Sequence, residues 1–101
     1  MRLILFFDLP VGTDSQRRAY RKFRKYLIKG GYIMLQESVY SKLVINQTNA
    51  NLALAKLKKN KPPQGLVQLL TITEKQYASI DNITGSVYNC HIDSTQRLVI
   101  L

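Results

Sequence analysis

The chain has 101 residues, of which 46% are hydrophobic, and 15 lysines and arginines outnumber 6 acidic residues to give a net charge of +9. This length and apolar content favour one folded domain with a modest core, and they exclude an intrinsically disordered chain. The single cysteine, Cys90, excludes an internal disulfide. No apolar run reaches the roughly 18 residues of a membrane span, and the N-terminal run lacks a signal-peptide cleavage site. We expect a soluble, cytoplasmic protein.

The charge imbalance predicts a polyanionic partner, nucleic acid rather than an anionic membrane. The alternative is a basic protein whose charge only keeps it in solution.

The first expected element is a strand over residues 2–8, because residues 3–7 form an apolar run too short for a helix core. Pro10 lacks an N–H group and ends the strand near Asp8. Alternation places Leu3, Leu5 and Phe7 on one face and Ile4, Phe6 and Asp8 on the other. Both faces are apolar and need cover. Helices of the same chain can cover one face, and we expect a second copy of the protein to cover the other.

A helix is expected next, capped by Thr13 or Asp14 and running to Lys29, where Gly30-Gly31 stops it. Its buried stripe consists of Ala19, Tyr20, Phe23, Tyr26 and Leu27. Its other faces carry Arg17, Arg18, Arg21, Lys22, Arg24, Lys25 and Lys29. With no acid among these cations, their mutual repulsion points to an external anionic partner.

A β-hairpin is expected over residues 32–36 and 39–45, and a second helix capped by Thr48 or Asn49 follows it. This helix buries Ala50, Ala53, Leu54 and Leu57. It carries a second basic cluster of Lys56, Lys58, Lys59 and Lys61. Pro62-Pro63-Gln64-Gly65 then turns the chain.

The remaining elements are a strand over 66–72, a short helical turn through Ile80 with a capping box from Thr73 to Gln76, a polar segment over 81–93, and a strand over 96–101. The order β-α-β-β-α-β plus a strand is typical of an α+β, ferredoxin-like fold. We expect one domain over 1–101, with a core over 1–80 and a C-terminal loop and strand over 81–101. That strand either pairs with its own sheet or, as we favour, crosses to the partner of a homodimer packed sheet to sheet.

Asp8 lies on the face of the expected first strand that a second copy would cover, and it is a candidate metal-binding residue. If two sheets stack about a two-fold axis, Asp8 and its symmetry mate lie close together, and a divalent ion such as Mg²⁺ would relieve their repulsion and supply a bound water to attack a phosphodiester. The alternative is that Asp8, two residues before Pro10, only forms a turn. His91 is expected to be a surface residue.

The motifs in order resemble a known family. They are Phe-Phe-Asp-Leu-Pro at 6–10, the basic helix at 17–25, Gly31, Leu-Gln-Glu-Ser-Val-Tyr at 35–40, the segment at 69–77, and Leu-Val-Ile-Leu at 98–101. Together they resemble the small CRISPR-associated endoribonucleases, the second protein of the CRISPR adaptation machinery, in the branch that accompanies large single-protein effectors.

This resemblance implies an adaptation (spacer acquisition) protein: a homodimer with crossing C-terminal strands that bridges two CRISPR integrase dimers and binds a double-stranded DNA prospacer. It implies catalytic and metal-binding roles for Asp8, with one Mg²⁺ per dimer, in an endonuclease that the scaffold role does not need. The nucleic-acid contacts expected are Arg17, Arg18, Arg21, Lys22, Arg24, Lys25, Lys29, Lys56, Lys58 and Lys59. The interface residues expected are Ile4, Phe6, Leu98, Val99, Ile100 and Leu101, with 81–93 and 96–101 facing the integrase. The alternatives are a stand-alone metal-dependent endoribonuclease and a ferredoxin-fold RNA-binding or toxin-like protein.

Overall fold

The computed structural model of the chain describes residues 1–85. The elements in chain order are β1 (Arg2–Asp8), α1 (Asp14–Lys29), β2 (Ile33–Gln36), β3 (Val39–Leu43), α2 (Gln47–Lys59), β4 (Leu66–Ile72) and α3 (Glu74–Ala78). The strand expected over 96–101 lies outside the described residues. Within residues 1–85, no helix is both long enough and apolar enough to cross a membrane.

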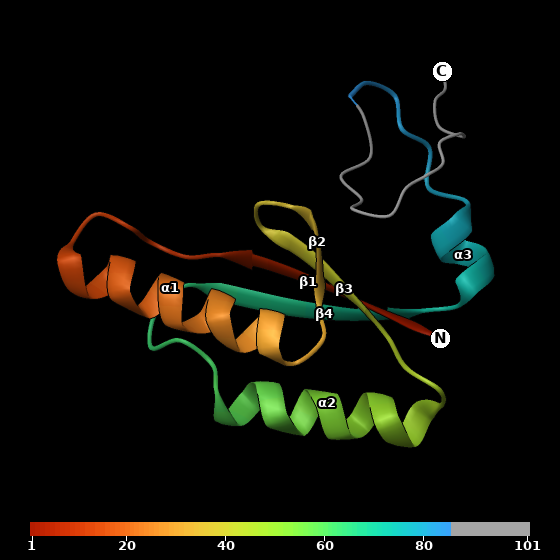
Figure 1. Ribbon diagram of the computed structural model, residues 1–101, viewed down its shortest axis with the longest axis horizontal. Coiled ribbons are helices and arrows are strands. Elements are labelled where there is room, and N and C mark those ends of the chain that lie inside the picture. The colour runs from red at the N-terminus through yellow and green to blue at the C-terminus, as the bar shows by residue number, and fades with distance from the viewer. Residues whose placement is uncertain (86–101) are drawn as a thin grey trace.

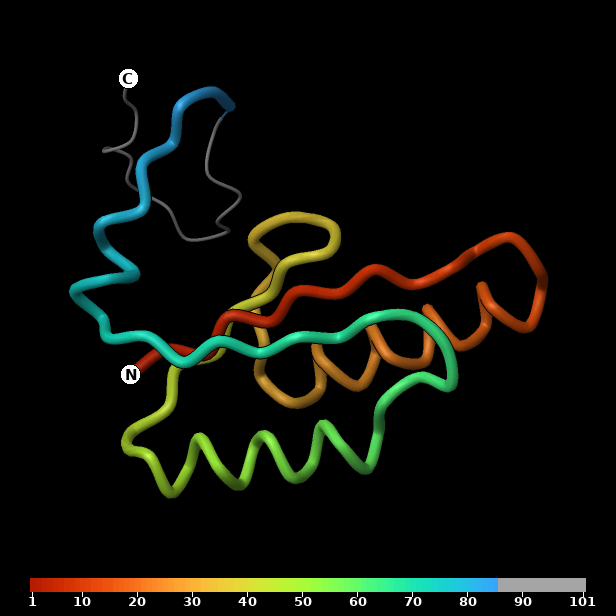
Figure 2. Tube along the Cα trace, turned by 180° about the vertical axis from the view of Figure 1, so that it is seen from behind, coloured from red at the N-terminus to blue at the C-terminus, as the bar shows by residue number. Residues whose placement is uncertain are grey.

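The four strands form one antiparallel sheet in the order β2-β3-β1-β4. Helices α1 and α2 lie together beside the sheet, while α3 stands apart from them beyond the end of β4 (Figure 1). The view from behind shows β1 and β4 running side by side through the middle of the molecule (Figure 2). This arrangement confirms the predicted α+β, ferredoxin-like class.

The core lies between the sheet and the two long helices, on the side of β1 that the alternation predicted. Phe7 packs edge-to-face on Phe23 of α1, with ring centroids 5.5 Å apart, and stacks on Tyr40 of β3 at 5.7 Å. Such aromatic pairs contribute about 0.5–1.5 kcal/mol beyond the area they bury. A second cluster joins Leu3 to Ala50 and Ala53 of α2. Helices α1 and α2 therefore cover only one face of the sheet.

Helix α1 begins and ends where the sequence predicts. Thr13 is the N-cap, its side chain accepts a hydrogen bond from the backbone N–H of Gln16, and the Gln16 side chain accepts from the backbone of Thr13. Gly30 closes the helix, and Gly31 adopts a φ of 89° that L side chains rarely adopt. The buried side chains of this helix are Phe23 and Leu27.

The prediction that Thr48 or Asn49 caps α2 was wrong. The cap is Asn46, whose side chain accepts a hydrogen bond of 2.9 Å from the backbone N–H of Asn49. The earlier start changes little in the buried stripe of α2, but Leu54 proves to be exposed. A polar run such as 46–49 offers several equivalent caps, and the point at which the chain leaves β3 selects among them.

Strand β3 ends at Leu43 rather than at residue 45. Its neighbour β1 begins at Arg2, which pairs with Leu43, so no partner strand extends beyond this point. The N–H of Val44 instead donates to the carbonyl of Met1 at 3.0 Å, and its side chain is buried under α2. Likewise α3 ends at Ala78, before Ile80, because the Ser79 hydroxyl donates to the carbonyl of Gln76 at 2.7 Å.

Candidate functional site

The face of the sheet opposite α1 and α2, here called the open face, exposes several large apolar side chains. Register places on it Ile33 of β2, Phe6 of β1, and both Leu66 and Leu70 of β4, which are 42%, 38%, 56% and 51% exposed. Ile4, also predicted to contact a partner, is only 6% exposed. Its neighbours within the protomer already cover it, so Ile4 would add little surface to an interface.

Asp8 is the last residue of β1 and projects from the edge of the open face. Asp8 pairs with Leu66 of β4 in the register of the sheet, and it is exposed to solvent. Gly65, with a φ of 98°, lets the turn before β4 approach this site closely. A Cβ atom at position 65 would lie 2.7 Å from the Asp8 carbonyl oxygen and 2.6 Å from Leu9 Cδ2. The absence of a side chain at Gly65 therefore helps to set the position of Asp8.

A single protomer offers too few ligands for a metal centre at Asp8. Among residues 1–85, no three histidine, cysteine, aspartate or glutamate side chains gather where they could hold a metal ion. Mg²⁺ commonly uses one or two carboxylates and fills its remaining positions with water. The donor chemistry therefore fits Mg²⁺ if a second protomer brings its own Asp8.

The cations of α1 are all exposed, and helical periodicity divides them into two flanks on either side of the buried stripe. The arginine flank consists of Arg17, Arg21 and Arg24. The lysine flank consists of Arg18, Lys22, Lys25 and Lys29. The two flanks meet where Arg21 and Lys25 lie one turn apart, so the cations of α1 form one continuous basic surface opposite the buried stripe.

Two members of the arginine flank are fixed by hydrogen bonds. Arg17 donates to the carboxylate of Asp14 and, at 3.0 Å, to the carbonyl of Val11. Arg24 donates through Nε to the hydroxyl of the buried Tyr40 at 3.2 Å. Arg17 therefore has an acid partner within the protein, because Asp14 lies one turn earlier on the same face.

The cations of α2, in contrast, do not all share one surface. Lys56 lines a groove with Lys29 of α1, whereas Lys58 and Lys59, both exposed, do not line it. The structure thus joins one residue from each predicted basic cluster. It does not bring either cluster to Asp8, because Asp8 lies on the open face and the helices lie on the other.

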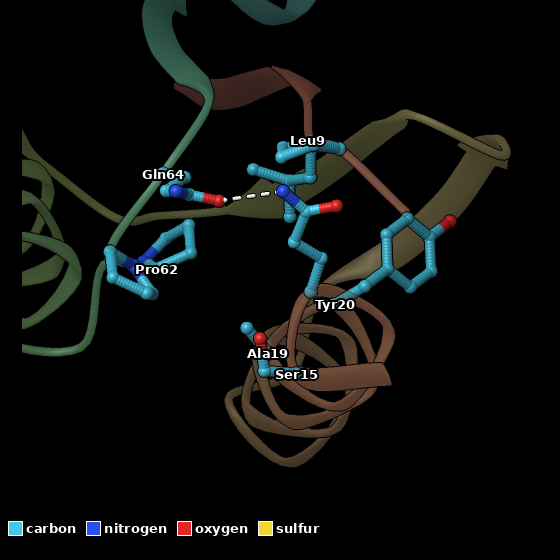
Figure 3. Close-up of a pocket in the computed structure, with 9 residues that line it drawn as sticks. Leu9, Ser15, Ala19, Tyr20, Pro62 and Gln64 are labelled. Carbon is cyan, nitrogen blue, oxygen red and sulfur yellow. Dashed lines mark hydrogen bonds between the residues drawn. The ribbon is translucent and has the colours of Figure 1, made fainter. Parts of the chain in front are cut away.

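A smaller pocket of about 200 Å³ lies at the N-terminus of α1 and was not anticipated from the sequence. Figure 3 shows Leu9 and Tyr20 on one side of it and Pro62 and Gln64 on the other. The amide of Gln16, already part of the capping box, donates to the Gln64 side chain at 3.0 Å. This bond ties the start of α1 to the turn before β4. The predicted interface residues Leu98, Val99, Ile100 and Leu101, and His91 and Cys90, lie outside the described residues.

Comparisons with known proteins identify the family. Residues 1–80 match the family described as CRISPR associated protein Cas2. The chain is 54% identical to the CRISPR-associated endoribonuclease Cas2 of Treponema denticola, with all of both chains covered. It is 48% identical to the protein of that name from Streptococcus mutans serotype c (strain UA159), covering 100% of this chain and 93% of the relative. It is also similar in fold to the crystal structure of Streptococcus pyogenes Cas2 at pH 6.5, with a TM-score of 0.63, 13% identity, and coverage of 83% of this chain and 100% of that one. The chain therefore belongs to the Cas2 family of CRISPR-associated proteins.

Proposed function

We propose that the protein acts in CRISPR spacer acquisition as a homodimer that binds double-stranded prospacer DNA and bridges two integrase dimers. The observation that carries this proposal is the division of the molecule into an apolar open face and a basic helical side. The first is suited to a second copy of the chain and the second to a polyanion.

The dimer is supported by the exposure of Phe6, Leu66 and Leu70 on a face that α1 and α2 leave uncovered. Contiguous apolar patches on a soluble protein commonly mark interaction sites. Two copies stacked through this face would hide these side chains and leave α1 and α2 on the outside. The C-terminal strand over 96–101 would cross to the partner, and segments 81–93 and 96–101 would face the integrase.

DNA binding is supported by the number and exposure of the cations. Of the ten residues expected to contact nucleic acid, six lie on α1 and have no acidic partner among residues 1–85. Contacts of lysine and arginine with phosphates release counterions and carry no sequence selectivity. A dimer doubles this basic surface, which suits a long duplex.

The test is the salt dependence of binding to a prospacer-length duplex, measured by fluorescence anisotropy. With roughly 6–10 phosphate contacts, affinity should fall about 10³–10⁵-fold between 50 and 200 mM salt. Replacing Arg17, Arg18, Arg21 and Arg24 by alanine should weaken binding and flatten this dependence, whereas Lys75→Ala on α3 should not. A flat salt response of the wild-type protein, or unchanged binding by the quadruple variant, would exclude this role. Co-purification with the integrase from the same locus tests the bridging role.

A second candidate function is metal-dependent endoribonuclease activity, which the names of the relatives support. In this proposal Asp8 from each protomer is a catalytic and metal-binding residue. A Mg²⁺ ion held there would act as a Lewis acid and orient a water molecule. The Asp8 carboxylates themselves would hold the ion, and the substrate phosphate would bind through the ion rather than to the carboxylates.

Asp8→Asn separates the two functions. This substitution should abolish Mg²⁺-dependent cleavage of RNA or DNA and leave dimerisation and prospacer integration intact. Cleavage that persists in Asp8→Asn would assign the activity elsewhere. A stand-alone endoribonuclease would cleave RNA without forming a complex with the integrase.

A further inference from the structure

A groove of about 520 Å³ lies on the helical side of the sheet, between the C-terminal end of α1 and residues 49–56 of α2. We call it the lysine groove. Lys29 lines it from α1, Lys56 from α2 and Lys42 from β3, with Tyr32 also contributing to its lining. Three elements that are distant in sequence therefore place three ammonium groups around one depression.

The charge of this groove is not balanced from within. Among the described residues that line it there is no aspartate or glutamate. Within residues 1–85 the ion pairs are Arg2–Glu74 and Arg17–Asp14, so Lys29 and Lys56 take part in neither. Lys42 donates to the carbonyl of Gly30 and lies 5.4 Å from the Tyr32 ring centroid, which fixes its position but leaves its charge uncompensated.

The exposed apolar side chains of the groove are aliphatic. Ile45 is 84% exposed and Leu52 is 57% exposed, and both line it. Two aromatic residues line the groove: Tyr26 is partly exposed, whereas Tyr32 is only 7% exposed, and burial, with a smaller effect of Tyr26, raises the pKa of Tyr32 to about 12. Tyr32 is therefore neutral and presents almost no ring surface.

We propose that the lysine groove is a docking site for a protein segment that carries acidic and aliphatic side chains. Carboxylates of the segment would pair with Lys29 and Lys56, and a leucine or isoleucine side chain would pack against Ile45 and Leu52. These two lysines would then contact the segment rather than the prospacer duplex, which the other cations of α1 would hold. Single-stranded nucleic acid is disfavoured, because its recognition relies on successive bases stacked on exposed aromatic side chains, and the groove offers only the partly exposed Tyr26. A dimer formed through the open face would leave this groove accessible, since the two lie on opposite sides of the sheet.

The experiment is a selection of short, random, phage-displayed peptides against the full chain, with counter-selection on the double variant Leu52→Asn, Lys56→Gln. Both residues are exposed, so the variant should keep its fold, and thermal unfolding checks this. Fluorescein-labelled peptides from the selection are then measured by anisotropy against single variants. The matched controls are Leu54→Asn and Lys58→Gln, which remove the same side-chain types from parts of α2 outside the groove.

We expect the selected peptides to combine acidic and aliphatic residues. Lys56→Gln and Leu52→Asn should each weaken their binding about tenfold, as expected for losing a charged hydrogen bond or a buried aliphatic contact, while the two controls change it little. Failure to enrich any peptide, or peptides insensitive to both groove substitutions, would overturn the proposal. Labelled oligo-dT provides a second probe: weaker oligo-dT binding by Lys56→Gln than by Lys58→Gln, with peptide binding indifferent to Leu52→Asn, would identify a phosphate site instead and also overturn it.

Discussion

Arg2 and Glu74 join the first strand to the last described helix by two hydrogen bonds, 3.0 Å from Nε and 2.8 Å from Nη2 of the guanidinium. The Arg2 guanidinium carbon also lies 4.2 Å from the centroid of the Tyr77 ring. Register places Arg2 on the same face of β1 as Phe6. This contact therefore fixes α3, and the direction in which the chain leaves it, relative to the open face.

Glu74→Gln should reduce the loss of folding stability that occurs as the pH falls into the acidic range. The hydrogen bond from Arg2 holds the pKa of Glu74 below its ordinary value of 4.5. A carboxyl group whose pKa is lower in the folded state stabilises the protein above its unfolded pKa, and this contribution is lost as the pH falls through the folded pKa. The melting temperature of the wild-type protein should therefore fall more steeply below about pH 4.5 than that of Glu74→Gln.

Glu37→Gln is the control, because Glu37 is an exposed carboxylate in the β2–β3 turn without an ion-pair partner among residues 1–85. It should keep the wild-type pH profile. Identical profiles for Glu74→Gln and the wild-type protein would mean that the contact with Arg2 does not persist in solution.

Gly65→Ala should destabilise the fold and disturb Asp8. An alanine at a φ of 98° is strained, and its Cβ would press on the carbonyl oxygen of Asp8 as well as on Leu9. We expect a loss of at least about 2 kcal/mol in the free energy of unfolding, measured by urea denaturation. Gly85→Ala is matched in backbone conformation, with a φ of 84°, but its Cβ would meet nothing within 4 Å. An equal cost at both positions would show that the approach to Asp8 has no energetic role.

Asn46→Ala should cost about 1 kcal/mol of stability, because it removes the side-chain acceptor that satisfies the Asn49 N–H at the start of α2. Thr48→Ala changes a residue inside the first turn and should stay within about 0.5 kcal/mol of the wild-type protein. Chemical denaturation of the two variants compares them directly. A larger loss for Thr48→Ala would place the cap where the sequence first suggested it.

Phe6→Glu should convert the proposed dimer into monomers. Phe6 lies near the middle of the open face, and a carboxylate there would be buried without a partner in each copy, raising the dimer dissociation constant by about 10²-fold or more. Sedimentation velocity measures this change. Leu54→Glu adds the same charge to an exposed position on α2 and should leave the dimer intact. A wild-type protein that sediments as a monomer would remove the basis of the proposed function.

The elements that the sequence placed correctly are those with local signals. The strand over 2–8 is delimited by its own apolar run and by Pro10, and α1 and α3 each begin at a threonine with a glutamine three residues later. These signals depend on hydrogen bonds and dihedral angles within a few residues. They are therefore readable without knowledge of the neighbours.

The tertiary structure alone decided which residues meet. Strand β3 stops at Leu43 because its neighbour β1 begins at Arg2, and no local property of residues 44 and 45 encodes that limit. Leu52 and Leu54 are alike in the sequence, yet only Leu52 lines the groove, because the packing of α2 on the sheet sets the rotation of the helix. Strand register and helix docking bring together residues that are distant in the sequence: Lys29 with Lys56, Arg2 with Glu74, and Gly65 with Asp8. Composition and spacing determine how many charges the chain carries, but contacts across the fold determine which of them can act together.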